Sequence, residues 1–214
     1  EIYSERLIKE GALTQAELDG MVKALDEFLD EEFEKGKTYR PESADWLDGK
    51  WAGLGLPEDD DRRGQTAVET ARLKAIGDRL TTVPNSVDAH KTVKKVYDQR
   101  AKAITTGQGL DWATAEMMAF GSLLSEGFPV RLSGQDSCRG TFSQRHSHIV
   151  DQTNEHRYTP LRQLRHEQAD YEVIDSALSE EAVLGFEYGY SSADPWTLVI
   201  WEAQFGDFAN GAQV

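Results

Sequence analysis

The feature that most constrains the fold is an alternation of apolar helix and strand patterns in the second half of the chain. Residues 111–124 are apolar on nearly every side, which is typical of a buried helix. Gly127 ends this helix, and residues 128–133 follow as a predicted strand. Residues 176–190 give a second apolar helix and residues 197–201 a second buried strand. This alternation predicts an α/β fold with a parallel sheet.

The first half is predicted to be helical and charged. Thr14 and Glu17 have the spacing of a capping box, which marks the start of a helix. Further helices are predicted over 66–80 and 86–106, separated at Pro84 because proline cannot continue a helix. The apolar residues of the first helix recur at helical spacing, and they are Leu18, Met21, Val22, Leu25, Phe28, Leu29 and Phe33.

These patterns predict two domains. Residues 1–108 form a helical connector that contains an irregular segment at 37–64. Residues 109–214 form the α/β domain, in which 137–170 is a loop and 205–214 begins another helix. Because the chain starts inside a helix and stops as a new one begins, we expect an internal fragment, truncated at its C-terminus.

Composition excludes several classes of function. A net charge of −15 disfavours nucleic acids and anionic membranes as partners, because both reward clustered Lys and Arg. No apolar run approaches the roughly 20 residues that span a bilayer. The single cysteine, Cys138, excludes an internal disulfide framework and suits a reducing compartment. Known phosphate-loop, dinucleotide and zinc motifs are missing, as is the Gly-Asp-Gly signature that would hold a magnesium diphosphate.

A polar loop at 134–148 is the first candidate for function. It follows a predicted strand, and ligands of open α/β sheets bind beyond the carboxyl ends of strands. Its Arg139, Arg145, His146 and His148 either meet an anionic ligand or hold neighbouring carboxylates in place. Residue types alone leave both interpretations open.

Two further stretches have a simple structural interpretation when taken alone. Glu180 and Glu181 open an apolar helix, where acids complement the helix dipole. Phe205 and Phe208 follow a strand, where aromatic side chains ordinarily pack in a core.

Taken together, these stretches resemble one family, the decarboxylating first component of 2-oxoglutarate dehydrogenase, which depends on thiamine diphosphate. The resemblance runs along the whole chain, in the family's order. Besides the helix that Asp111 and Trp112 open, it rests on 44–49 (ADWLDG), 130–136 (VRLSGQD), 139–146 (RGTFSQRH), 177–183 (ALSEEAV), 186–190 (FEYGY) and 201–213 (WEAQFGDFANGAQ).

The resemblance implies a transketolase-like aminopyrimidine-binding domain in a homodimer, with each thiamine diphosphate site shared between two kinds of domain. The diphosphate and its Mg²⁺ would bind outside this chain, so no metal ligand is expected within it. The implied activity is the oxidative decarboxylation of 2-oxoglutarate in the tricarboxylic acid cycle. The succinyl group would pass to a lipoyl-bearing dihydrolipoyl succinyltransferase in a multienzyme complex.

The resemblance also assigns roles to individual residues. Glu180 would be catalytic, as a desolvated carboxyl group that shares a proton with the pyrimidine ring nitrogen. The remaining implied contacts are the aromatic rings of Phe205 and Phe208 stacked on the pyrimidine, Gln135 and the backbone of Leu178 at its edge, and Asp136 and His146 in the pocket or an interface.

Alternative functions stay open at this point. A 2-oxoadipate dehydrogenase or a bifunctional oxoglutarate decarboxylase would use the same residues, and a non-catalytic interface module is a further alternative. The expected location is the bacterial cytoplasm, or the mitochondrial matrix in a eukaryote.

Overall fold

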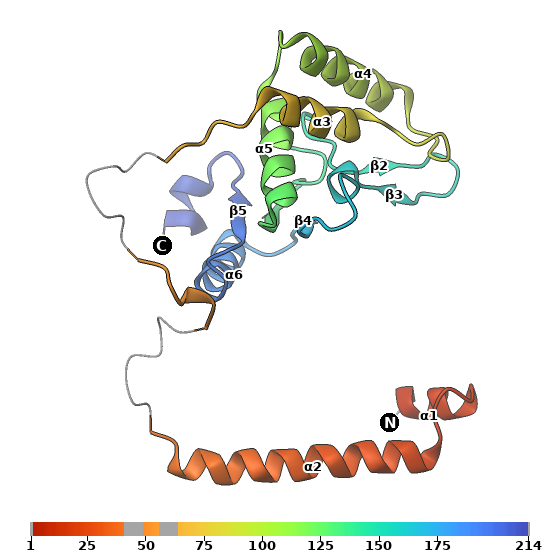
Figure 1. Cartoon of the computed structure of the whole chain (residues 1–214), viewed down its shortest axis with the longest axis vertical. Coiled ribbons are helices and arrows are strands. Elements are labelled where there is room, and N and C mark those ends of the chain that lie inside the picture. Colours follow the sequence, from red (N-terminus) through yellow and green to blue (C-terminus); the bar gives the residue numbers. More distant parts are fainter. Residues whose placement is uncertain (1, 41–48, 56–63, 214) are drawn as a thin grey trace. The chain divides into compact units, whose positions relative to one another are not determined.

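The computed structural model describes residues 2–40, 49–55 and 64–213. Its contacts divide the chain into two compact units, 1–48 and 49–214. The first unit contains the helices α1 (Ile2–Lys9) and α2 (Gln15–Thr38), drawn in red and orange in Figure 1. The helices between residues 49 and 108 belong to the second unit by their contacts. The predicted domain boundary at 108 stays a prediction.

Helix α2 begins as its sequence predicts. The Thr14 hydroxyl oxygen accepts a hydrogen bond from the Glu17 N–H at 3.2 Å, and the Glu17 carboxylate accepts one from the Thr14 N–H at 2.8 Å. This reciprocal pair confirms the capping box. No described residue of α1 or α2 is buried, so the apolar stripe of α2 is exposed within this unit.

A three-stranded parallel sheet organises the second unit. Its strands are β1 (Val130–Gly134), β4 (Tyr171–Asp175) and β5 (Leu198–Glu202), in the order β4-β1-β5. Gly134 pairs with Asp175 on one side and with Glu202 on the other, so all three strands end at one edge. The α/β class and the parallel sheet are therefore confirmed.

Helices cover both faces of this sheet (Figure 1). Val130 and Leu132 belong to the buried core with Phe120 and Leu124 of α5 (Trp112–Glu126), whereas Arg131 between them faces away. The helices α3 (Thr70–Thr81) and α4 (Lys91–Thr106) pack together outside α5, and α6 (Glu180–Ala193) lies on the other face.

A buried ion pair joins α6 to the sheet. The Arg131 guanidinium donates to both carboxylate oxygens of Glu187 in α6, at 2.8 and 3.0 Å, and to Glu172 of β4 at 2.5 Å. The hydrogen bonds to Glu187 hold the pKa of Arg131 above its ordinary value. The rings of Phe186 and Tyr190 flank the same guanidinium, at 5.3 and 4.8 Å from their centroids. The Arg131 cation that joins α6 to the sheet is thus partnered by two carboxylates and two aromatic rings.

Helix α5 ends as predicted. Gly127 takes the left-handed conformation, with φ of 93°, and its N–H donates to the carbonyls of Leu123 and Leu124. A glycine at this position closes the helix without the steric cost that a Cβ would add.

The long segment between β1 and β4 contains more structure than the sequence predicts. It includes the short antiparallel pair β2 (Ile149–Val150) and β3 (Arg157–Tyr158) and the 3-10 helix η3 (Pro160–Arg162). The predicted loop at 137–170 was therefore only partly right. Strand β4, which follows it, was not predicted, although the buried Tyr171 and Val173 stand on either side of the charged Glu172.

Two further predictions need correction. The described residues of the segment predicted to begin a helix at 205–214, which end at 213, do not form an α-helix but two 3-10 helices, η4 (Asp207–Ala209) and η5 (Gly211–Gln213). The irregular segment predicted at 37–64 lies partly in α2 and contains the 3-10 helix η2 (Gly49–Trp51). Apart from Gly49, the motif at 44–49 lies outside the described residues.

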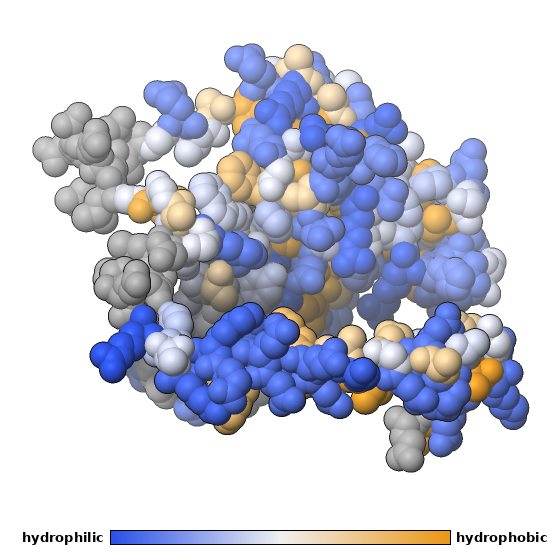
Figure 2. Space-filling model, turned by 60° about the horizontal axis from the view of Figure 1, so that its bottom comes forward, coloured by the Kyte–Doolittle hydropathy of each residue, from blue (hydrophilic) through white to orange (hydrophobic). Residues whose placement is uncertain are grey.

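The exposed surface is largely polar. Hydrophilic side chains cover most of the face shown in Figure 2, in keeping with charged residues at 29% of the sequence. Within the described part of the chain, no helix combines the length and the apolar character needed to cross a bilayer.

Two glycines in mid-helix provide a matched test of this packing. A Cβ at Gly121 of α5 would lie 2.6 Å from Ile76 Cγ2, whereas one at Gly185 of α6 would have no atom within 4 Å. We expect Gly121→Ala to destabilise the chain by about 1–3 kcal/mol through overpacking. Gly185→Ala should be neutral or stabilise it by up to about 1 kcal/mol, since alanine favours a helix. Urea unfolding of both variants measures the difference, and equal stabilities would contradict the packing of α3 on α5.

Candidate functional site

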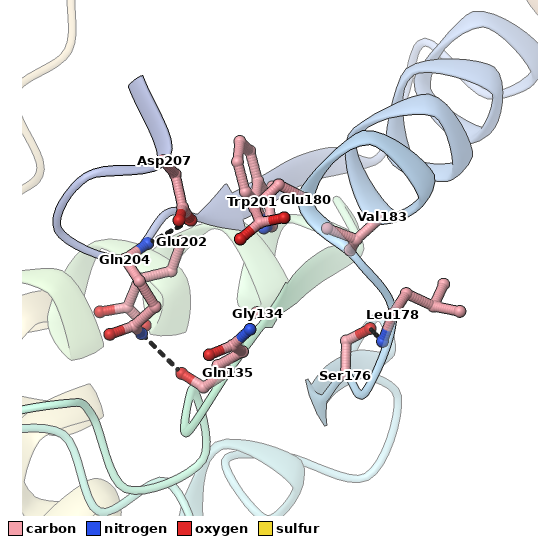
Figure 3. A pocket seen from close by; sticks show the side chains of 10 residues that line it. All are labelled: Gly134, Gln135, Ser176, Leu178, Glu180, Val183, Trp201, Glu202, Gln204 and Asp207. Carbon is pink, nitrogen blue, oxygen red and sulfur yellow. Dashed lines mark hydrogen bonds between the residues drawn. The ribbon is translucent and has the colours of Figure 1, made fainter. Parts of the chain in front are cut away.

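A small hollow opens at the edge of the sheet where all three strands end (Figure 3). Its volume is about 10 Å³. Pockets that hold a whole small ligand usually measure about 300–1,000 Å³, so this hollow can receive only one end of such a ligand. It is lined by Gly134, Gln135, Ser176, Leu178, Glu180, Val183, Trp201, Glu202, Gln204 and Asp207.

Glu180 enters the hollow from the first turn of α6. The Ser179 hydroxyl caps this helix by accepting from the Ala182 N–H at 3.4 Å, which fixes where the helix begins. Figure 3 shows the Glu180 carboxylate directed into the hollow beside Trp201. Glu181, one residue further on, is exposed and does not line the hollow.

The hollow holds three carboxylates, and two of them are engaged. Glu202 accepts from Arg145 at 2.5 Å, and Asp207 accepts from the Gln204 N–H at 2.7 Å. The Glu180 side chain makes no hydrogen bond or ion pair with any residue in the described part of the chain. Glu180 is therefore the carboxylate that remains available to a ligand.

Arg145 is almost fully buried beneath this edge, with its side chain 5% exposed. It donates to Glu116 of α5, to Glu202 of β5 and to the carbonyl of Ser137. Burial by itself would lower the pKa of Arg145, but the hydrogen bonds to Glu116 and Glu202 outweigh it and raise that pKa. Of the two interpretations of the polar loop, Arg145 fits the one in which it holds neighbouring carboxylates.

Gln204 ties the rim of the hollow together. Its side-chain amide donates to the Gln135 carbonyl at 3.0 Å and to the Thr141 hydroxyl at 2.8 Å, while Asp207 holds its backbone N–H (Figure 3). Sequence reasoning missed Gln204 and Asp207 as site residues. Nothing in the sequence pattern indicates that Gln204 contacts a loop more than 60 residues away, or that Asp207 holds the Gln204 N–H.

Gly134 allows the strands to close on each other at this edge. Its φ is 151°, and a Cβ there would lie 2.5 Å from the Glu202 carbonyl oxygen and 2.7 Å from the Ser137 hydroxyl. Only glycine fits this close approach, so the turn into the polar loop depends on it.

The structure brings some of the predicted site residues together. Gln135, Leu178 and Glu180 all line the hollow. Phe205 and Phe208 do not; they contact each other edge to face, with ring centroids 5.8 Å apart, and are 98% and 64% exposed. The interpretation of these two rings as core packing is therefore wrong, and their predicted stacking on a cofactor stays a prediction.

Asp136 and His146 lie outside the hollow. Asp136 is exposed, has a φ of 57° and pairs with Arg139 at 2.9 Å. His146 is half-buried, and its backbone carbonyl accepts a hydrogen bond from Tyr97 at 2.8 Å. Burial, followed by the charge of Arg100, lowers the pKa of His146 and favours the neutral ring.

Cys138 and His148 have structural surroundings. Burial, followed by the neighbouring Asp175, raises the pKa of Cys138 to about 11, so its thiol stays protonated near neutral pH. The His148 ring shares a hydrogen bond of 2.8 Å with the Thr159 hydroxyl. Among the described residues, no group of three or more His, Cys, Asp or Glu side chains is arranged to hold a metal ion.

Comparison with known families identifies the fold around this hollow. Residues 108–214, half of the chain, match the family described as the transketolase pyrimidine-binding domain. The chain belongs to this family. The matched region contains α5, the three-stranded sheet and α6, and it includes every residue that lines the hollow.

Relatives extend the similarity to the whole chain. It is 57% identical over 216 aligned positions to the 2-oxoglutarate dehydrogenase E1 components of Brucella canis and Brucella abortus (strain S19), and 56% identical to that of Brucella anthropi. The alignments cover all of this chain but only 22% of each relative. The family resemblance and the fold class predicted from the sequence are thereby confirmed.

The rim of the hollow is testable without a ligand. Replacing Gln204 with alanine removes the side-chain hydrogen bonds that hold the loop at Gln135 and Thr141. We expect faster amide hydrogen exchange over residues 135–141 with little change in the core strand β1, because loop openings need not unfold the sheet. Gln213→Ala, at an exposed position outside the hollow, is the matched control. Unchanged exchange in Gln204→Ala would show that other contacts hold this loop.

Proposed function

We propose that this chain supplies the aminopyrimidine half of a thiamine diphosphate site in the first component of 2-oxoglutarate dehydrogenase. The activity would be oxidative decarboxylation of 2-oxoglutarate, with transfer of the succinyl group to the lipoyl group of a second component. One observation supports this most directly: within a pyrimidine-binding fold, Glu180 is the unengaged carboxylate of the hollow at the sheet edge.

The residues around the hollow fit a pyrimidine ring. A ring nitrogen needs a carboxyl group within reach, and Glu180 offers one. The ring edge also needs polar partners, which the Gln135 side chain and the Leu178 backbone can supply. A diphosphate with its metal ion would need oxygen ligands for that ion, which the family resemblance implies lie outside this chain. The hollow therefore suits the pyrimidine end of the cofactor, and we assign the Mg²⁺ diphosphate to another part of the protein.

Glu180 would act by holding a proton at the pyrimidine nitrogen. When bound, thiamine diphosphate supplies the nucleophilic carbon that attacks the keto group of a 2-oxo acid. Positioning at the start of α6, with no competing partner among the described residues, leaves the Glu180 carboxyl free to share this proton. Glu202 and Asp207 are already engaged and would shape the hollow instead.

The exposed side chains around the hollow favour a shared site. Phe205 and Phe208 extend from its edge into solvent, although aromatic rings of this size are normally covered. On α6, Phe186 and Tyr188 are also 55% and 74% exposed. Exposed apolar surface of this kind marks protein contacts, so we propose a homodimer in which a second domain completes each site. We also propose the lipoyl-bearing succinyltransferase as partner and the bacterial cytoplasm as location.

The role of Glu180 can be tested in the full-length enzyme. Glu180→Gln keeps the shape of the side chain but removes the proton-sharing carboxylate, so turnover should fall by roughly 10²–10⁴-fold, the usual contribution of a positioned acid or base. Glu181→Gln is the matched control, since its carboxylate points about 100° away round the helix and should be dispensable. Steady-state turnover measured for both variants tests which of the two carboxylates is needed. Near-normal turnover in Glu180→Gln would show that another carboxylate holds the proton.

The shared-site proposal makes a separate prediction for the chain by itself. Because the hollow measures only about 10 Å³ and would receive one end of the cofactor, the isolated chain should bind thiamine diphosphate weakly or not at all. Isothermal titration calorimetry measures this binding, with the full-length enzyme as the positive control. Micromolar affinity for the isolated chain would contradict a site shared between domains.

A further inference from the structure

We propose that Arg145 is a positioning residue of the thiamine diphosphate site, because it holds Glu202 and thereby leaves Glu180 as the proton-sharing carboxylate. This inference rests on the proposed function and adds a residue that does not itself line the hollow. Of the three acidic side chains that line the hollow, a single one is then left without a hydrogen-bond partner among the described residues.

The contacts of Arg145 divide between two carboxylates on opposite sides of its guanidinium. Nε and Nη2 donate to the two oxygens of Glu116 at 2.6 and 3.2 Å. Nη1 donates to Glu202 at 2.5 Å and to the Ser137 carbonyl at 2.8 Å. A single buried cation thus joins α5, the loop after β1 and the end of β5.

Glu202 is the carboxylate that would otherwise compete with Glu180. It lines the hollow together with Glu180, and its backbone position is fixed by pairing with Gly134 of β1. Without Arg145, a half-buried negative charge would remain in the hollow. A second carboxylate near Glu180 would favour the protonated form of either group, since like charges oppose ionisation.

Other charged groups near the sheet edge have partners or point away. Asp207 of η4 is held by the Gln204 N–H, and Asp175 of β4 accepts from the Cys138 N–H. Asp136 pairs with Arg139 in the exposed loop, and Glu181 is exposed on α6. Glu116 of α5 faces the opposite side of Arg145 and does not line the hollow. Glu202 is therefore the charge near Glu180 that depends on Arg145.

A purely structural role for Arg145 makes a different prediction. If Arg145 only cross-linked the three segments, every variant that removes its contacts would weaken the protein alike, without changing any proton affinity. If it controls charge, the effect should depend on whether Glu202 keeps its carboxylate. Glu116 provides the matched control, because Glu116→Gln removes the other ion pair of the same guanidinium and leaves no unpaired charge in the hollow.

The experiment measures thiamine diphosphate affinity of the full-length protein by calorimetry over a range of pH. In Arg145→Gln, the pH midpoint of cofactor binding should move upward by roughly one unit. The negative charge of the unpaired Glu202 would make the carboxyl groups that line the hollow keep a shared proton to higher pH. The double variant Arg145→Gln/Glu202→Gln should return the midpoint to the wild-type value. Glu116→Gln should leave it there.

The outcomes separate this inference from the proposed function. An unchanged midpoint in Arg145→Gln, or a shift that the double variant does not reverse, would overturn the role of Arg145 while leaving the site intact. Failure of the wild-type protein to bind the cofactor would overturn the proposed function, and this inference with it. Should Arg145→Gln not fold, Arg145→Lys keeps the charge but cannot hold two carboxylates with one planar fork. A smaller upward shift is expected there, and no shift would overturn the inference.

Discussion

The site depends on the parallel pairing of β1 with β4 on one side and β5 on the other. This pairing ends all three strands at one edge, although the strands lie about 40 and 70 residues apart in the sequence. The loop after β1, the start of α6 and the segment after β5 consequently meet there. In open α/β sheets this edge is where ligands bind, because helix starts and loop amides gather at it.

Two largely buried arginines stabilise this arrangement on different faces of the sheet. Arg131 joins β1 to α6 through Glu187, and Arg145 joins α5 to β5 through Glu116 and Glu202. Each guanidinium meets two carboxylates, so neither cation is left unpaired where solvent is excluded. In the hollow this compensation also decides which acid remains free. The net charge of −15 does not reveal this pairing, because it sums the charges of surface and interior residues alike.

We propose that the hollow belongs to a site that needs more than this chain. It is small, its predicted aromatic partners Phe205 and Phe208 face solvent, and the chain spans only 22% of the length of its relatives. These observations support a cofactor held between domains, one of which provides the acid for the pyrimidine and another the ligands for the diphosphate.

Local sequence patterns predicted many of the helices and strands of this protein. The capping box at Thr14, the buried helix before Gly127 and the apolar runs of β1 and β5 follow from nearest-neighbour chemistry, and motif resemblance singled out Glu180. Strand β4 was missed because its five residues follow a long polar loop, and the end at 205–214 was wrong because 3-10 turns and helix starts share residue types.

Only the tertiary structure decided which polar groups meet. Sequence alone could not tell whether Arg145 serves a ligand or a neighbouring carboxylate, whether Phe208 is covered, or that Gln204 holds the loop at Gln135. These are contacts between segments far apart in the chain, and their free energy depends on distance and burial, which a one-dimensional pattern does not contain.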